Sequence, residues 1–492
     1  MKYNPTKINF VLLAILIIGV FFRFINFQDR VGFGQDSARD AIIALYSINH
    51  HKLPLLGPPS SAWAFNFGPL YYYVVAIFTL IIPGIFSPWI GFTLLSVSSV
   101  YLAYKTGEKA FDKKFGLIFA FISAISFAEI ANSTGLSNTL LVSFATALSF
   151  YLLAQSLKSQ KKIFPLLLGF SVALAVNSHL QALSLLALLP LAVLFSVGKT
   201  KQKLAKASFV SLGFVLSFTP LIIFEFQHNL AWTKSLIDYS LHGQQKFYTP
   251  VRWLTEFSQF WPRTFGQIMS GLPIAGYFYA GLILLTICLS FVKKIKLPRF
   301  FYCLAITFII EIISVRLYKG SRSPEYFIIA HQFVLFFIAF SIWITFSVNK
   351  ILGMIILLLI SVITVKNDLL LISLKSNAPD VLDLFAKEKQ YLSGQKAEFY
   401  GMANSWGSSI AIYYLNYRQN ITGAGLKLVI CDNLDKSNEY CPVQGRLYQS
   451  GRLVMYSIES LGKTKFNEYQ TESLNAQTYY DRTYDNYELR KK

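Results

Sequence analysis

Charged residues are scarce in this sequence. They make up 14% of its 492 residues, whereas hydrophobic residues make up 54% and aromatic residues 16%. Soluble globular domains carry about 25% charged residues, so this composition excludes an ordinary soluble protein and indicates a polytopic membrane protein. Acidic residues are especially few, since 25 aspartates and glutamates stand against 45 lysines and arginines.

Familiar enzyme and transporter motifs are also lacking. There is no Walker loop, no metal-protease helix, no nucleophile elbow and no Cys-x-x-Cys pair. The two halves of the chain share no evident pattern of broken helices, which many transporters have. Of only four cysteines, Cys288 and Cys303 fall in apolar segments, whereas Cys431 and Cys441 could form a disulfide in an oxidising exterior.

Eleven apolar segments are present and long enough to cross a bilayer. A transmembrane helix needs roughly 17 to 25 apolar residues. The segments are residues 8–25, 88–104, 115–131, 138–157, 163–178, 180–197, 208–224, 273–292, 300–315, 326–347 and 351–368. No small-residue cleavage pattern follows the first segment, so we expect an uncleaved anchor.

A further apolar segment, residues 70–86, could be counted as a twelfth span. If it does not cross, every lysine-rich loop lies on the same side as the N-terminus, as the positive-inside rule requires; if it crosses, these loops are split between the two sides. We therefore predict that this segment is an interfacial or re-entrant part of a long outer loop, residues 26–87. The net charge of +20 then comes mainly from basic residues in the short inner loops. These residues form no contiguous patch, so the charge does not indicate a nucleic-acid partner.

The sequence changes character near residue 370. Residues 1–370 form the predicted membrane module, and residues 371–492 form a mixed stretch that the span count places outside. Alternation predicts strands at 426–431 and 453–458, and residues 409–417 fit a helix or a strand. We expect a small extracytoplasmic α/β or α+β domain.

Two acidic residues just outside the first span attract attention, because carboxylates beside a bilayer are costly and tend to mark function. They belong to Asp36-Ser37-Ala38-Arg39-Asp40-Ala41, and Phe67-Gly68-Pro69-Leu70-Tyr71-Tyr72 follows. Together these stretches resemble the Asp-Glu-x-Arg-x-Ala and Gly-Pro-Leu-x-Tyr motifs of the polyprenyl-phosphate-sugar-dependent glycosyltransferases of the GT-C fold. The similar group is that of the protein O-mannosyltransferases and the aminoarabinose lipid A transferases, and the resemblance extends over about residues 1–370.

The resemblance implies a plasma-membrane enzyme that moves a sugar from a polyprenyl-phosphate donor to a hydroxyl of a protein, lipid or glycan acceptor at the outer face. Asp36 would be the base, and Arg39 would orient it or contact phosphate. Arg316, Lys319 and Arg322 form the predicted phosphate clamp, with lipid head-group contact as the alternative role. The full predicted substrate-binding set is Asp40, Asn66, Tyr71, His179, Glu225, His228, Arg316, Lys319, Arg322, Glu325 and Tyr326.

One departure from the family pattern concerns metal binding. Asn66-Phe67 stands where the lipid A transferases have Glu-Lys, which removes one metal ligand and one phosphate-binding lysine. A divalent metal ion is therefore an open alternative, for which Glu225, His179 and His228 are the replacement ligands. The rival classes are a flippase or transporter of lipid-linked sugars and a non-catalytic scaffold for polysaccharide assembly, neither of which needs the Asp36 loop.

Overall fold

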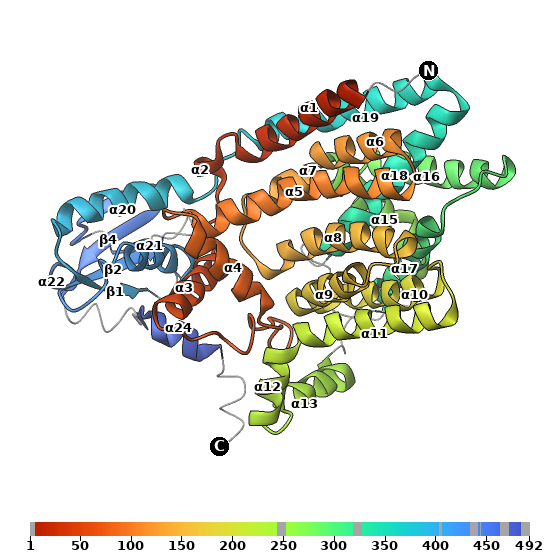
Figure 1. Cartoon of the computed structure of the whole chain (residues 1–492). Helices are drawn as coiled ribbons and strands as arrows, with labels where there is room; N and C mark the ends of the chain where they lie inside the picture. Colours follow the sequence, from red (N-terminus) through yellow and green to blue (C-terminus); the bar gives the residue numbers. More distant parts are fainter. Residues whose placement is uncertain are drawn as a thin grey trace.

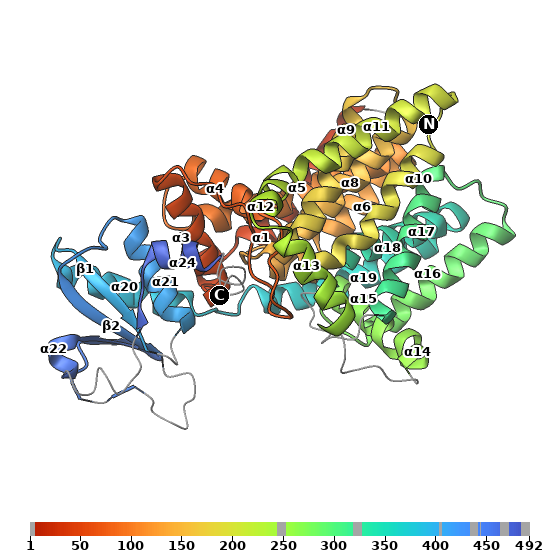
Figure 2. The same cartoon turned by 90° about the horizontal axis from the view of Figure 1, so that it is seen from below.

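The long helices lie side by side in a bundle, and one end of this bundle carries an α/β region (Figure 1). The computed structural model describes residues 5–243, 252–317, 327–402, 406–432, 441–442, 444–462 and 472–483. Seen from below, helices α3 and α4 lie between the bundle and the C-terminal strands (Figure 2). The polypeptide that follows the first helix therefore occupies the junction of the two parts.

Each of the eleven predicted segments is helical. The helices are α1 (Pro5–Phe24), α5 (Ser87–Ala110), α6 (Lys113–Ala124) with α7 (Phe127–Asn132), α8 (Asn138–Lys158), α9 (Ile163–Ser178), η1 (Leu180–Ala187) with α10 (Leu188–Leu194), α11 (Thr200–Ser217) with α12 (Thr219–Gln227), α16 (Ala275–Val292), α17 (Arg299–Leu317), α18 (Ile328–Val348) and α19 (Lys350–Leu371).

The predicted count of eleven spans is not confirmed. Within the described residues, four helices are long and apolar enough to cross a membrane: α8, α16, α18 and α19. A fifth span is obtained if α11 and α12, which meet at a bend of 57°, act together. Several other segments are shorter or are divided by breaks such as the one between α6 and α7, whereas α5 is long enough but not sufficiently apolar.

Helix α18 forms the centre of the bundle. It is apolar on all sides, and 94% of its most apolar stretch is buried, as expected for a helix that is surrounded by others. Phe333, Phe336 and Phe340 make edge and stacked contacts with rings from α6, α8 and α17. By contrast, only 17% of the corresponding stretch of α19 is buried, so α19 presents an apolar face outward.

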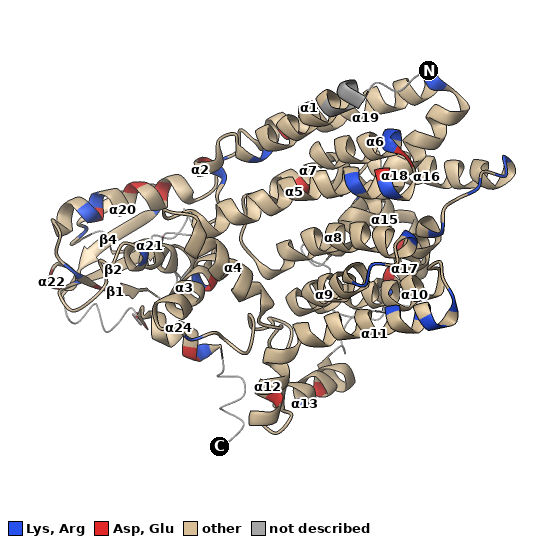
Figure 3. Ribbon diagram, in the orientation of Figure 1, with Lys and Arg blue, Asp and Glu red and all other residues tan. Residues whose placement is uncertain are grey.

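Lysines and arginines gather at the end of the bundle opposite the α/β region (Figure 3). They belong to the connections α5–α6, α8–α9, α10–α11 and α16–α17. This separation is the pattern on which the topology prediction depends. Residues 70–81 form the short helix α4 (Leu70–Ile81), which lies with α3 at the opposite end.

The C-terminal region contains a five-stranded sheet with the strand order β3-β4-β2-β1-β5. Its strands are β1 (Ala397–Gly401), β2 (Leu426–Asp432), β3 (Tyr448–Ser450), β4 (Leu453–Ser457) and β5 (Glu472–Ser473). Strands β1 and β2 are parallel and are joined through helix α21 (Trp406–Arg418), whereas the other pairs are antiparallel. Helix α20 (Ala378–Leu392) packs against the sheet as well. The two predicted strands are confirmed, residues 409–417 prove to be helical, and Cys431 and Cys441 form a disulfide.

Specific hydrogen bonds fix the C-terminal region on residues 26–87, the predicted outer loop. The hydroxyl of Tyr414 donates to the carbonyl of Ile85 (2.9 Å), and Arg418 donates to the carbonyl of Thr79 (3.0 Å). Helix α3 (Gln35–Asn49) packs against α21 and against α24 (Ala476–Arg482). Because ten of its fifteen residues are buried, α3 is held on several sides.

Candidate active site

Helix α3 begins at a well-anchored turn. The ring of Phe33 packs against Trp89, with a distance of 5.0 Å between ring centroids. The backbone N–H of Phe33 donates to the side chain of Asn377, and the carbonyl of Phe33 accepts from the same side chain. Gly34 is the N-cap residue, which places Asp36 in the first turn, where the helix dipole favours a negative charge. The turn therefore holds the predicted base at a fixed position.

Arg39 joins two carboxylates of opposite exposure. Its Nη1 lies 2.6 Å from Oδ1 of Asp36, whose side chain is 73% exposed. Its Nε and Nη2 donate to Oδ1 of Asp40 (3.0 and 2.8 Å), whose side chain is 1% exposed. Tyr72 also donates to Asp40, at 3.2 Å. One guanidinium thus connects the accessible carboxylate of Asp36 to the buried carboxylate of Asp40.

Burial perturbs this cluster. Loss of hydration raises the pKa of Asp40 to about 6, and the charge of Arg39 opposes that rise. For Arg39, burial favours the neutral form, but Asp40, Tyr72 and Asp36 outweigh burial, so that the pKa of the guanidinium is raised. Arg39 therefore remains a permanent cation beside Asp36.

Asp36 and Arg39 open onto a large cavity of about 780 Å³. This volume lies within the ~300 to 1,000 Å³ typical of small-molecule sites. The lining combines polar side chains, among them Ser137, Asn138, His179 and Gln181, with apolar ones, among them Phe65 and Phe67. Besides those residues, the described lining consists of Pro58, Pro59, Ser60, Ser61, Ala62, Thr139, Leu180, Leu183, Ser184, Leu236, Tyr239, Ser240, Glu311, Ser314, Val315 and Phe327.

The loop that precedes α4 shapes the cavity through close backbone contacts. The N–H of Gly68 donates to the carbonyl of Asn177 (2.8 Å), and a Cβ at position 68 would lie only 1.8 Å from Oδ1 of Asn177, so a larger residue does not fit. This contact brings the ring of Phe67 to 4.8 Å from the imidazole of His179. Burial lowers the pKa of His179 to about 4, which makes it a neutral hydrogen-bonding group on the cavity wall.

Three predicted substrate-binding residues have buried contacts outside the lining of this cavity. Asp40 and Tyr71 lie in the packing of α3 against α4. Asn66 is fully buried, and its amide donates to the carbonyls of Gly57 and Thr483, both at 2.9 Å. Asn66 therefore connects the outer loop to the end of α24.

The predicted metal ligands do not converge. Glu225 accepts hydrogen bonds from the backbone N–H groups of Trp232 (2.8 Å) and Thr233 (3.1 Å), which caps helix α13 (Ala231–Asp238). The ring of His228 stacks on Phe224, and only His179 lines the cavity. No group of three or more His, Cys, Asp or Glu side chains in the described part of the chain is arranged to hold a metal ion.

The predicted phosphate clamp lies only partly within the described residues. Arg316 is buried, with its guanidinium 4.6 Å from the centroid of the Trp253 ring, and its neighbour Val315 lines the cavity. Lys319, Arg322, Glu325 and Tyr326 lie outside the described residues. Arg39 is the one lysine or arginine within the described lining of the cavity.

Several lining residues were not predicted as substrate-binding. Glu311 and Ser184 come from α17 and η1, and Tyr239 follows α13. A buried glutamate inside a predicted span was the one available signal for Glu311, because intramembrane carboxylates tend to be functional. Nothing in the local sequence distinguishes Tyr239 from an ordinary loop residue.

One segment of the chain matches the model of a known protein family. Residues 66–224 match the family model described as Dolichyl-phosphate-mannose-protein mannosyltransferase. The matched segment includes Gly68 in the loop before α4 and His179 on the cavity wall. It ends at Phe224, one residue before Glu225. The resemblance inferred from the outer-loop motifs is therefore confirmed, since this segment matches the family model and the fold is similar to that of ArnT, a structure of the same fold class.

Solved structures have a similar fold over most of this chain. The crystal structure of ArnT from Cupriavidus metallidurans in the apo state aligns with a TM-score of 0.60 at 9% identity, covering 92% of this chain and 98% of ArnT. ArnT bound to undecaprenyl phosphate aligns with a TM-score of 0.61 over the same shares. The apo oligosaccharyltransferase of Archaeoglobus fulgidus aligns with a TM-score of 0.50 at 13% identity, covering 88% of this chain and 70% of that one. At such identities the similarity establishes the fold alone. No match is found among curated proteins.

Proposed function

We propose that this protein is a membrane glycosyltransferase that moves a sugar from a polyprenyl-phosphate donor to an acceptor hydroxyl, with Asp36 as the general base. The observation that carries this proposal is the exposed carboxylate of Asp36, held by Arg39 at the rim of a cavity with both polar and apolar walls. ArnT, which shares the fold, was crystallised with undecaprenyl phosphate. An apolar wall beside a charged rim suits a ligand that combines a lipid chain with a phosphate.

The proposed reaction is a displacement at the anomeric carbon of the donor sugar. The acceptor oxygen forms the new glycosidic bond while the bond from that carbon to the phosphate oxygen breaks. The acceptor proton passes to Asp36, and the electron pair of the broken bond leaves with the polyprenyl phosphate. Arg39 holds the carboxylate in place and stabilises its negative charge before the transfer.

The departing phosphate needs a cation close to the reacting centre. Arg39 is occupied by Asp36 and Asp40, so the clamp of Arg316, Lys319 and Arg322 stays the proposed partner of the phosphate. Replacement of Arg322 by alanine should then lower the specificity constant for the donor roughly ten- to a hundredfold, because one charge-assisted contact contributes about 1.5 to 3 kcal/mol. A residue that only contacts lipid head groups would leave the kinetics within about twofold.

We also propose that the catalytic end of the bundle faces the outside of the plasma membrane. The lysine-rich connections lie at the other end, where the positive-inside rule places the cytoplasm. The C-terminal region, residues 371–492, would then be extracytoplasmic, where the Cys431–Cys441 disulfide is chemically stable.

The test is transfer in vitro. The purified protein is reconstituted with polyprenyl-phosphate hexoses and pentoses carrying a radiolabelled sugar, together with cell-envelope extract as the acceptor source. We expect release of polyprenyl phosphate and appearance of the label in a second product. Movement of the intact labelled lipid between leaflets, without cleavage, would instead indicate a transporter.

A further inference from the structure

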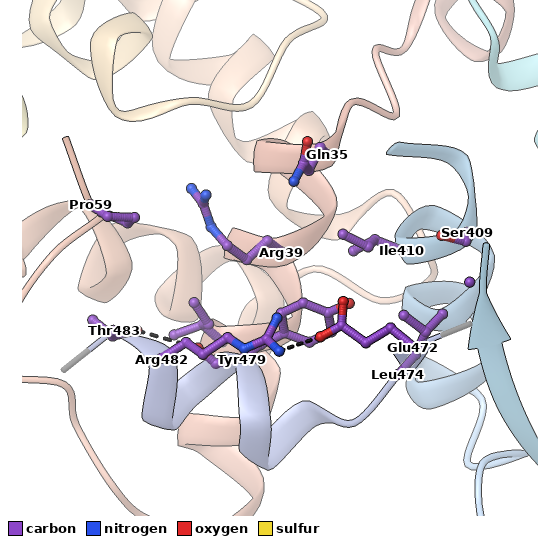
Figure 4. Close-up of a pocket in the computed structure, with 12 residues that line it drawn as sticks. Gln35, Arg39, Pro59, Ser409, Ile410, Glu472, Leu474, Tyr479, Arg482 and Thr483 are labelled. Atoms are coloured by element: carbon purple, nitrogen blue, oxygen red, sulfur yellow. Dashed lines mark hydrogen bonds and ion pairs between the residues drawn. The ribbon is translucent and has the colours of Figure 1, made fainter. Parts of the chain in front are cut away.

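A smaller pocket lies where α3 meets the C-terminal region (Figure 4). Its volume is about 190 Å³, and its walls come from α3, the outer loop at Pro59, β1, α21, β5 and α24. Arg39 and Pro59 line both this pocket and the large cavity. The two spaces therefore meet at the side chain that positions Asp36.

The lining of the pocket combines an aromatic ring, an aliphatic wall and several hydrogen-bonding groups. Tyr479 supplies the ring, and Glu472 and Arg482 lie beside it (Figure 4). Besides Arg39, the other lining residues are Ile43, Pro59, Ile410 and Leu474, which are apolar, and Gln35, Gly401, Ser409 and Thr483. A small number of polar groups on a mostly apolar surface is typical of a small-molecule site.

The charges in the lining are paired. Arg482 forms an ion pair with Glu472, and Arg39 is held by Asp36 and Asp40. These carboxylates would repel the negative charge of a phosphate or carboxylate ligand. The pocket therefore favours an uncharged ligand that both donates and accepts hydrogen bonds. Its volume is below the ~300 to 1,000 Å³ of sites for drug-sized ligands, which suits a single ring.

We propose that this pocket binds one sugar ring of a carbohydrate acceptor, next to the ring whose hydroxyl reaches Asp36. Hydroxyl groups of the ring would bond to Glu472, Arg482 and Gln35, and its C–H face would pack on Tyr479. The proposal deepens the proposed function, since it specifies a glycan as the acceptor class and rests on that function. It also assigns a task to the C-terminal region, which supplies most of the lining.

The location of the pocket distinguishes acceptor from donor. The lining of the large cavity includes Leu180 and Leu183 of η1 and Phe327 just before α18, which offer apolar surface to a lipid chain. None of the described residues that line the small pocket belongs to a helix of the bundle. A donor that is anchored in the bilayer would reach the large cavity first, which leaves the small pocket to the other substrate.

Direct binding provides the first test. The protein is placed in lipid nanodiscs free of maltoside detergent, and saturation-transfer NMR is recorded with the methyl glycosides of glucose, galactose, mannose, N-acetylglucosamine and rhamnose. We expect saturation transfer to at least one of these glycosides. Absence of transfer to all five would overturn the proposal, whatever the outcome of the transfer assay.

Matched variants locate the binding. Glu472→Gln removes the carboxylate at similar size, and Tyr479→Leu removes the aromatic face, so both should abolish the signal, whereas Tyr479→Phe should retain it within about twofold. Asp383→Asn is the control, because it breaks a surface ion pair with Lys387 in the same region without touching the pocket. Equal signals in Glu472→Gln, Tyr479→Leu and the control would place the sugar elsewhere and refute the assignment.

Kinetics separate this proposal from the proposed function. In Glu472→Gln the KM for the glycan acceptor should rise at least about tenfold, while the KM for the donor and the slow hydrolysis of the donor by water stay within about twofold. If the wild type turns over no donor, the proposed function fails, and the binding result stands separately. If the wild type transfers sugar and Glu472→Gln has an unchanged acceptor KM, the acceptor pocket fails while the proposed function survives.

Discussion

Replacement of Arg39 by alanine should loosen helix α3. The guanidinium makes two hydrogen bonds to Asp40, whose side chain is 1% exposed, so the variant leaves a buried carboxylate without its cation. Removal of one partner from a buried pair costs about 3 to 5 kcal/mol, and we take the lower end because Arg39 itself is 19% exposed. A loss of about 3 kcal/mol corresponds to a roughly hundredfold larger equilibrium constant for the opening of α3, and hence to faster exchange of its amides.

The assay is native-state hydrogen exchange of the α3 amides, which reports local opening. Because burial raises the pKa of Asp40 to about 6, above its usual value of 3.8, the folded state prefers the protonated acid. Protonation of Asp40 therefore stabilises the folded state most below about pH 4, and this stabilisation is lost as the pH rises through 6. The defect of Arg39→Ala should therefore be larger at pH 8 than at pH 5, after correction for intrinsic exchange.

The double variant Arg39→Ala/Asp40→Asn is the matched control. It removes the buried charge together with its partner, so α3 should regain most of its protection at pH 8. Transfer activity should not return, because Asp36 still lacks the guanidinium that orients it. Exchange in Arg39→Ala that equals the wild type, or no recovery of protection in the double variant, would refute this account of the cluster.

Three further predictions concern topology and stability. A cysteine introduced at Lys109 should react with an impermeant thiol reagent only from the cytoplasm and one at Asp383 only from outside; the reverse pattern would invert the proposed orientation. Glu225→Ala should destabilise α13 by about 1 to 2 kcal/mol, measured by hydrogen exchange, with the donor KM unchanged; a raised KM would return Glu225 to the substrate site. Reduction of the Cys431–Cys441 disulfide should lower the stability of the C-terminal sheet by about 2 to 3 kcal/mol in denaturant titration, and equal stability of both forms would contradict this.

Features that depend on local patterns were predictable from the sequence. Apolar length located the helices of the eleven predicted segments but not the shorter helix α15 (Trp261–Ser270), and alternation located β2 and β4, because burial of one or both faces imposes these periods on the sequence. The number of spans was not predictable in the same way. Breaks such as those at Ser126 and Phe218 arise where helices bend against their neighbours, and hydropathy alone does not register them.

The candidate site was only partly predictable, because a polar side chain has no local signal for its direction. Asp36 and Arg39 could be placed together since they share one turn of α3. Asn66 and Glu225 carry suitable groups in suitable motifs, but tertiary contacts direct those groups to backbone partners. Glu311 reaches the cavity from α17, a long way along the chain, so only the folded structure reveals it.

The central claim, that Asp36 is the base for sugar transfer, is tested most directly by Asp36→Asn. The amide retains the size of the carboxylate but cannot accept the proton of the acceptor, so the rate of transfer from labelled polyprenyl-phosphate sugar should fall at least about a hundredfold. Asp29→Asn, which removes an accessible carboxylate that lies 3.9 Å from Lys375 and outside the cavity lining, should retain wild-type activity. Transfer by Asp36→Asn at a rate close to that of Asp29→Asn would contradict the account.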